Sequence, residues 1–221
     1  LGKFFLLLDP FSLLCGVVSM SMLLMHGAAW LGLKTEGAIA ARARRYGSVA
    51  GLVAAGGYAL AGLWLLVGID GYRFVEAPSP DGPSNPLLSE VVREGTWLVA
   101  YLDRPWIAVA PLMGFVGIAM AVRGLRAGRD LSTMGWSKMA ILGIVSSVGL
   151  TMFPFILPST VDPNSSLTVW DSSSSHLTLF VMLGATAIFM PLILIYTAWV
   201  YRVLWGKVTE AEVSENGESL Y

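Results

Sequence analysis

The stretch His176–Tyr201 reads HLTLFVMLGATAIFMPLILIYTAWVY and contains no Asp, Glu, Lys or Arg. A helix needs about 20 predominantly apolar residues to cross the hydrocarbon core of a bilayer. This stretch is longer than that, so its length and its lack of charge predict a transmembrane helix.

Four other stretches without these charged residues reach or approach the same length: Pro10–Leu33, 46–69, Pro105–Val122 and Met139–Leu157. The third is the shortest, and Pro111 is expected to kink it. Of the 221 residues, 55% are hydrophobic and only 13% are charged, whereas a soluble domain carries about a quarter charged residues. We therefore predict an all-α integral membrane protein with five transmembrane helices in a single membrane domain, residues 1–221.

The charges between these stretches predict how the helices cross the membrane. Lys34–Arg45 and Arg123–Lys138 each hold four Lys or Arg and one carboxylate. Residues 70–104 hold six carboxylates and three Arg, and residues 158–175 hold no Lys or Arg. Cytoplasmic loops carry an excess of Lys and Arg. We therefore expect the first two linkers and the tail 202–221 in the cytoplasm, and the amino end and linkers 70–104 and 158–175 outside.

The outer linkers carry signals of local structure. Leu87–Leu98 mixes apolar and charged residues, which predicts an amphipathic surface helix with Trp97 at headgroup level. Asp162-Pro163-Asn164 predicts a turn, and Ser172–Ser175 can cap the last helix. Pro154 and Pro158 are expected to break the fourth helix at its outer end. Because the chain begins with Leu1 and not Met, we expect it to be part of a longer membrane protein.

The five predicted spans contain no ionised side chain, whereas ion-coupled transporters and proton pumps usually bury such groups. A route through hydroxyl groups and water stays open, for example through Ser19, Ser21, Ser146, Ser147 and Thr151. Small residues spaced by four, such as Gly51 with Ala55 and Gly143 with Ser147, predict close helix contacts. These contacts suit packing within the chain as well as docking to a second subunit.

The two histidines bear on haem binding. His26 lies roughly 24 Å inward from the outer end of its span at 1.5 Å per residue, and His176 lies at the outer start of the last span. They cannot both reach one iron, so we expect His26 to be hydrogen-bonded between helices. Pairing of His26 with a Met thioether on a haem stays open as the alternative. Cys15 is the only cysteine, which excludes a multi-cysteine metal site, and we expect it to be a small core residue.

Polar and aromatic residues at the outer helix ends are the remaining candidates for function. Asp70 is followed by Gly71 and Tyr72, and Asp171 follows Trp170. Trp and Tyr are common at headgroup level and Asp is common in turns, so interfacial anchoring is one reading. A polar contact to a partner subunit, or to an outer quinone pocket, is the other.

Several motifs resemble subunit II of the cytochrome bd quinol oxidases, and together they cover essentially the whole chain. The most specific are Thr151–Ser159, which reads TMFPFILPS, and Asn164–Asp171, which reads NSSLTVWD. The others are Asp9-Pro10-Phe11 running into Leu14–Ser19, Gly68–Tyr72, Asn85-Pro86-Leu87, Ile195–Trp199 and Ser219-Leu220-Tyr221. Subunits of that family have about eight helices, and the five spans here resemble the last five.

The resemblance implies an enzyme subunit of the bacterial cytoplasmic (inner) membrane that holds no complete catalytic site. The complex would oxidise quinol near the outer face and reduce dioxygen to water, generating a proton gradient. Haem b and haem d would be bound by the partner, subunit I, in a heterodimer with small accessory subunits. This chain would coordinate no haem or metal and supply no catalytic residue, with a bound quinone as a candidate ligand. The candidates for contact with subunit I or quinone are Asp70, Tyr72, Phe153, Pro154, Trp170, Asp171 and His26.

Two other classes of protein stay as alternatives. A multi-spanning transporter or permease fragment would also be rich in apolar helices, although the spans lack intramembrane charge. A membrane-anchoring dihaem cytochrome b would need paired histidines at matched depth, which the sequence does not offer. The net charge of −1 makes nucleic acid an unsuitable partner.

Overall fold

The computed structural model describes residues 8–76, 82, 85 and 89–209. The chain divides into two compact units. The helical unit comprises residues 1–70, 96–151 and 207–221, and the linker unit comprises residues 71–95 and 152–206. The family motifs at residues 86–87 and 219–221, and most of the predicted tail, lie outside the described residues.

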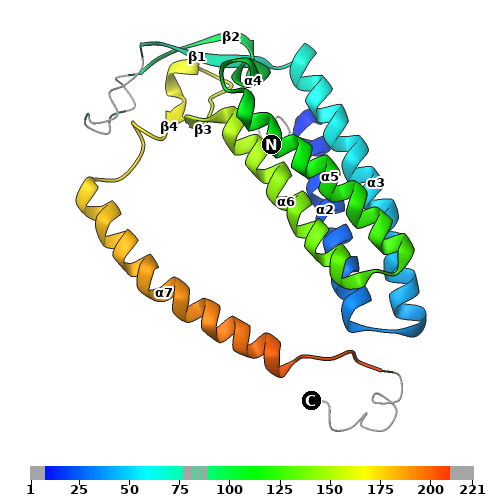
Figure 1. The fold of residues 1–221 in the computed structure, drawn as a ribbon. Helices are drawn as coiled ribbons and strands as arrows, with labels where there is room; N and C mark the ends of the chain where they lie inside the picture. The colour runs from blue at the N-terminus through cyan, green and yellow to red at the C-terminus, as the bar shows by residue number, and fades with distance from the viewer. Residues whose placement is uncertain (1–7, 77–81, 83–84, 86–88, 210–221) are drawn as a thin grey trace. The chain divides into compact units, whose positions relative to one another are not determined.

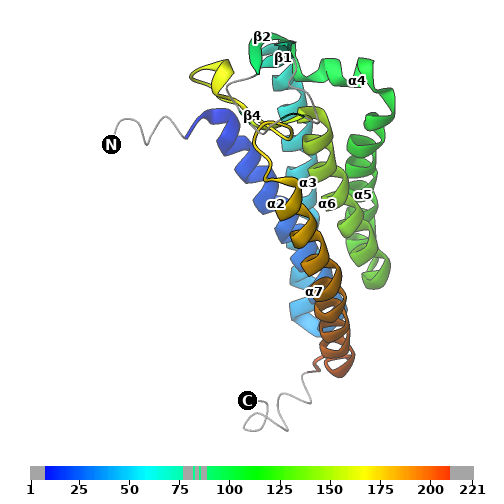
Figure 2. The same ribbon diagram turned by 90° about the vertical axis from the view of Figure 1, so that its left-hand side faces the viewer.

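Four long helices run side by side in the helical unit, as both Figure 1 and Figure 2 show. They are α2 (Pro10–Lys34), α3 (Gly37–Val67), α5 (Val109–Ala127) and α6 (Asp130–Met152), and the short α4 (Ala100–Asp103) precedes α5. The Asp9 carboxylate caps α2 by accepting the Phe11 N–H at 3.0 Å, and Pro10 suits the first helical turn. Gly128 ends α5 with a φ of +66°, a left-handed conformation that favours glycine.

Glycines set the helix spacing in this unit. A Cβ atom on Gly143 of α6 would lie 2.3 Å from the backbone nitrogen of Gly114 on α5. A Cβ atom on Gly51 of α3 would lie 2.5 Å from Val122 and 2.9 Å from the Met25 sulfur. Such contacts let helix backbones approach closely, as in other membrane bundles. The predicted close contacts at Gly51 and Gly143 are therefore confirmed, as packing within the chain.

Helices form in all five predicted stretches but have different ends. α3 begins at Gly37, so its first turns carry arginines that we expected in a linker, and α6 runs from Asp130 only to Met152. A helix can continue past the apolar core, because its charged end meets water and headgroups. Pro154 then prevents α6 from reaching residue 157. A 3₁₀ turn, Pro105–Ala108, passes into α5 just before Pro111.

Among the described residues, four helical segments are long and apolar enough to cross a membrane: Pro10–Lys34, Gly37–Val67, Pro105–Ala127 and His176–Val203. They confirm the predicted fold class, an all-α integral membrane protein. α6, which carries Asp130 and Lys138, is not one of the four. The number of spans therefore stays a prediction.

The described part of the linker unit contains two small sheets and one long helix. β1 (Asp70–Glu76) pairs with β2 (Glu90–Thr96), and β3 (Phe155–Leu157) pairs antiparallel with β4 (Leu167–Thr168). α7 (His176–Val203) follows, and none of its residues is buried within the described chain. Ser175 caps α7 by accepting the Thr178 N–H, as the sequence predicted.

The prediction of an amphipathic helix at Leu87–Leu98 is wrong over its described part. Residues 90–96 form β2, and Trp97–Val99 form a 3₁₀ turn. Adjacent valines favour a strand, and Gly95 has a φ of +71°, which an α-helix does not allow. The predicted turn at residues 162–164 is confirmed, because the Asp162 carboxylate accepts the Asn164 N–H at 3.1 Å.

Candidate functional site

Five aromatic residues of the linker unit form a cluster that joins two distant segments of the sequence. Tyr72 and Phe74 come from β1, Phe155 from β3, and Phe153 and Trp170 from the segments beside the β3–β4 sheet. The rings of Phe74 and Phe155 are stacked at 4.9 Å, and those of Phe153 and Trp170 meet edge to face at 5.5 Å. Tyr72 also meets Phe155 edge to face, at 6.0 Å. This aromatic cluster contains three of the predicted site residues: Tyr72, Phe153 and Trp170.

Hydrogen bonds fasten β1 and β2 to the segment 155–171. The Tyr72 hydroxyl donates to the Ser159 carbonyl at 2.7 Å, and the Asn164 side-chain oxygen accepts the Val91 N–H at 2.8 Å. The Arg93 guanidinium donates to the Thr160 carbonyl and lies 5.8 Å from the centre of the Tyr72 ring. Each of these bonds satisfies a backbone group, so they hold the loop in one conformation.

Asp171 is buried beneath this loop, with 1% of its surface exposed. One carboxylate oxygen accepts the Thr168 N–H at 2.8 Å and closes the turn that carries Trp170. Among the described residues, the other carboxylate oxygen and the buried Thr168 hydroxyl have no hydrogen-bond partner. Pro154 joins the same turn, because its carbonyl accepts the Val169 N–H at 3.0 Å. Asp171 is thus placed to position Trp170.

The loop also presents an apolar edge. Phe153, Ile156 and Leu157 are 44%, 56% and 62% exposed. Exposed apolar groups gathered beside a rigid polar loop suit contact with another protein or with lipid. Asp70, another predicted site residue, is exposed at the start of β1, and no described residue bonds its carboxylate.

The helical unit places His26 on a polar contact between α2 and α6. Its Nδ1 atom lies 2.9 Å from the Ser137 hydroxyl, at hydrogen-bond distance. This contact confirms the prediction of a hydrogen-bonded histidine between helices. His176 is exposed as the first residue of α7. The described residues contain no group of three or more His, Cys, Asp or Glu that could hold a metal ion. Cys15 is exposed on α2, so the expectation of a core cysteine is wrong.

A short run of hydroxyl groups links α3, α6 and α4. The Tyr58 and Ser147 hydroxyls lie 2.5 Å apart, and Thr151 donates to the Ser147 carbonyl at 2.6 Å. Thr151 also lies 2.9 Å from the Tyr101 hydroxyl. Of the hydroxyl residues singled out from the sequence, the structure joins Ser147 and Thr151. It adds two tyrosines, which charge and spacing did not indicate.

An ion pair that the sequence did not indicate joins the two linkers of the helical unit that are rich in Lys and Arg. The Arg44 guanidinium bonds the Asp130 carboxylate through two nitrogens, at 2.9 and 2.6 Å. Gly32 leaves room for it, because a Cβ atom there would lie 2.8 Å from Asp130. The pair places the linkers around residues 35 and 129 at one end of the bundle. The signal for this ion pair was Asp130, the one carboxylate in the basic linker Arg123–Lys138, which was predicted on the same side of the membrane as the linker Lys34–Arg45.

Comparison with known proteins decides the family. The sequence profile of the cytochrome bd terminal oxidase subunit II family matches residues 1–204. The chain belongs to this family. The match agrees with the resemblance carried by the TMFPFILPS and NSSLTVWD motifs, and it does not favour the transporter alternative. Both motifs lie in the segment that builds the aromatic cluster and the turn at Asp171.

Two relatives illustrate the range of the family. Over all 221 residues the chain is 40% identical to cytochrome bd-I ubiquinol oxidase subunit 2 of Escherichia coli strain K12. It is 37% identical to the probable cytochrome oxidase subunit 2 of Haemophilus influenzae. In each case the chain spans 58% of the relative's length.

Proposed function

We propose that this chain supports a bd-type quinol:oxygen oxidoreductase of the bacterial inner membrane as its non-haem subunit II. The match to the subunit II family over residues 1–204 carries the proposal. The complex would oxidise quinol, reduce dioxygen to water and generate a proton gradient. The five helices would be part of a bundle of about eight.

Haem b and haem d belong to the partner, subunit I, in this proposal. The His26 contact with Ser137 supports a packing role for that histidine. His176 starts α7 and is exposed. This chain would therefore supply no catalytic residue and coordinate no haem. A bound quinone and small accessory subunits stay as further expected components of the complex.

The proposed orientation places the amino end outside and residues 202–221 in the cytoplasm. The Arg44–Asp130 pair supports it, because both linkers that are rich in Lys and Arg lie at one end of the bundle. The Val208 N–H donates to the Lys34 carbonyl at 2.8 Å, so residues just after α7 lie at that end as well. By the charge of their own residues, linkers 70–104 and 158–175 would face outward.

We assign the contact with subunit I to the apolar edge of the linker unit. Phe153 and Trp170 supply aromatic surface, the kind most common at binding hot spots. Tyr72, Pro154 and Asp171 hold that surface in place through the bonds described above. Asp70 stays a candidate for a polar contact at the rim, and His26 stays a candidate inside the bundle.

The apolar edge can be tested without disturbing the loop itself. The Leu157→Asp substitution puts a charge on an exposed side chain of β3, outside the aromatic cluster. We expect loss of haem d absorbance in membranes and loss of co-purification with a haem-bearing subunit. The Val161→Asp control changes a residue that is 93% exposed in the same loop and should leave both unchanged. Normal haem d in the Leu157 variant would overturn this assignment.

A further inference from the structure

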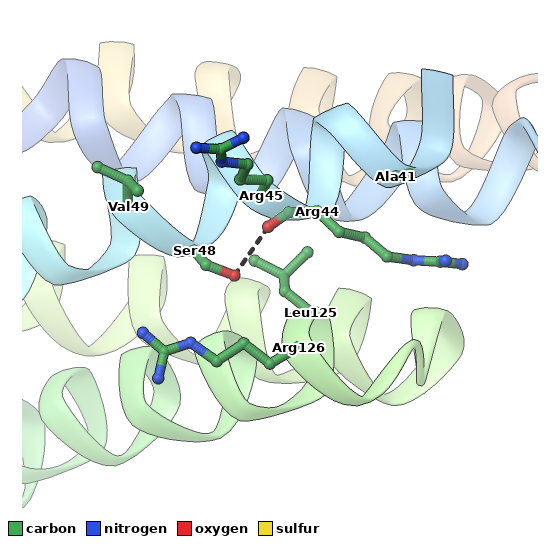
Figure 3. Close-up of a pocket in the computed structure, with 7 residues that line it drawn as sticks. All are labelled: Ala41, Arg44, Arg45, Ser48, Val49, Leu125 and Arg126. Atoms are coloured by element: carbon green, nitrogen blue, oxygen red, sulfur yellow. Dashed lines mark hydrogen bonds between the residues drawn. The ribbon is translucent and has the colours of Figure 1, made fainter. Parts of the chain in front are cut away.

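A basic groove lies between α3 and α5 at the end of the bundle that carries the ion pair. Its volume is about 450 Å³. Arg44 and Arg45 of α3 and Arg126 of α5 line it, together with the apolar side chains of Ala41, Val49 and Leu125 (Figure 3). None of its lining residues is acidic. The groove therefore combines three cationic groups with an apolar wall.

The three arginines are not equivalent. Arg44 is held by Asp130, and its carbonyl accepts the Ser48 hydroxyl at 2.7 Å, so Arg44 and Ser48 form a fixed wall. Arg45 and Arg126 are exposed, and neither side chain has a bonding partner among the described residues. In Figure 3 the Arg45 side chain projects upward from α3 and the Arg126 side chain extends to the left along α5, whereas the Arg44 guanidinium lies to the right. Two uncommitted cations thus flank one groove.

We propose that this groove binds the phosphate headgroup of an anionic phospholipid. A guanidinium group donates paired hydrogen bonds that match phosphate oxygens, and two of them here are available for that purpose. Basic pockets between transmembrane helices on the cytoplasmic side are suited to lipid headgroups. Val49, which is 56% exposed, offers apolar surface to an acyl chain beside them.

The apolar wall and the position of the groove favour a lipid over a soluble anion. α3 and α5 both belong to segments that can cross a membrane, and the groove lies near the end of each. A headgroup bound there leaves its acyl chains along the helices, in the leaflet. The inference needs the membrane insertion and orientation proposed above, but it does not need the oxidase activity.

The test uses the protein purified from membranes with its accompanying subunit, stripped of lipid by detergent exchange. Phosphatidylglycerol, phosphatidylcholine and inorganic phosphate are titrated separately, and the midpoint of thermal stabilisation is measured for each. One variant combines Arg45→Gln with Arg126→Gln. Its matched control combines Arg42→Gln with Arg123→Gln, which removes the same charge from the same helices outside the groove. All four arginines are exposed, so neither variant removes a packed side chain.

We expect phosphatidylglycerol to stabilise the parent and the control at the same concentration. The groove variant should need a roughly fivefold higher concentration of phosphatidylglycerol for each arginine lost. This factor corresponds to about 1 kcal/mol of binding free energy per basic residue near a membrane surface. Equal midpoints for both variants would overturn the proposed site. Equal stabilisation by phosphatidylcholine, or by inorganic phosphate, would overturn the anionic lipid as its occupant. Haem d content of the same samples reports separately on the proposed function.

Discussion

In the helical unit, α5 and α6 meet where Gly114 faces Gly143, and a single added carbon would reach the opposing backbone. In the linker unit, residues 155–171 are held to β1 and β2 by side chains that bond backbone groups and by stacked rings. Lipid offers helices no hydrophobic driving force to associate, so close packing of small residues has to supply the attraction. A loop has no regular ladder of hydrogen bonds, so each of its buried backbone groups needs its own partner.

The comparison predicts different weak points in the two units, and the largest effect belongs to the helical unit. Gly143→Ala places a Cβ atom 2.3 Å from the Gly114 nitrogen and 2.8 Å from the Ala110 carbonyl oxygen. Because backbone atoms cannot move aside, we expect a loss of about 3 kcal/mol or more of stability. Thermal unfolding of the purified complex measures it. Gly149→Ala on the same helix is the control, since a Cβ atom there meets nothing within 4 Å. Equal stability of the two variants would contradict packing by close approach.

The second prediction concerns the linker unit and the buried Asp171. Asp171→Ala leaves the Thr168 N–H without its acceptor, at a cost of about 1–3 kcal/mol. It should also lower haem d in membranes, because Trp170 loses its position. Asp171→Asn keeps an acceptor oxygen for that N–H and should keep most of the haem d. An equal loss with Asn and with Ala would indicate that the negative charge itself is required.

The third prediction concerns how much the Arg44–Asp130 ion pair adds to the stability of the helical unit. Arg44→Gln and Asp130→Asn each break a bidentate ion pair whose side chains are 30% and 12% exposed. Because water screens such a pair in part, we expect about 1–2 kcal/mol from either change. The double variant should lose little more than either single variant. Additive losses in a double-mutant cycle, followed by thermal unfolding, would show that the two side chains act independently.

The smallest effect is expected at His26. Replacing Ser137 by Ala, or His26 by Gln, removes one hydrogen bond between α2 and α6, worth about 0.5–1.5 kcal/mol. Haem absorbance at equal protein should not change, because the role that we propose for this histidine is packing. A shifted or missing haem band in the His26 variant, with Ser137→Ala unaffected, would instead make His26 a ligand.

The sequence predicted the parts of this fold that depend on local composition. Runs such as His176–Tyr201 identify membrane helices, and Asp162 and Ser175 identify a turn and a cap. It did not predict β2, because mixed apolar and charged residues suit a surface helix as well as a strand. Pairing with β1 and the left-handed Gly95 decide between them.

The candidate site was predictable in its members and not in its arrangement. Tyr72, Phe153 and Trp170 stand out as aromatic residues at helix ends. Their cluster also depends on Phe155, which lies inside a predicted span, and on Phe74, which lies in a predicted linker. Contacts between residues about 80 positions apart need the folded chain. The basic groove depends likewise on two linkers meeting at one end of the bundle.

Redox difference spectroscopy tests the central claim most directly, namely that this chain supports haem-bearing machinery and holds no haem itself. The host is a strain without other bd-type oxidases. We compare its membranes when it expresses this protein without subunit I with its membranes when it expresses both. We predict no haem d band from the protein alone, a haem d band when both are present, and no haem in the chain's protein once it is purified by itself. Haem bands that stay with that isolated protein would contradict the account.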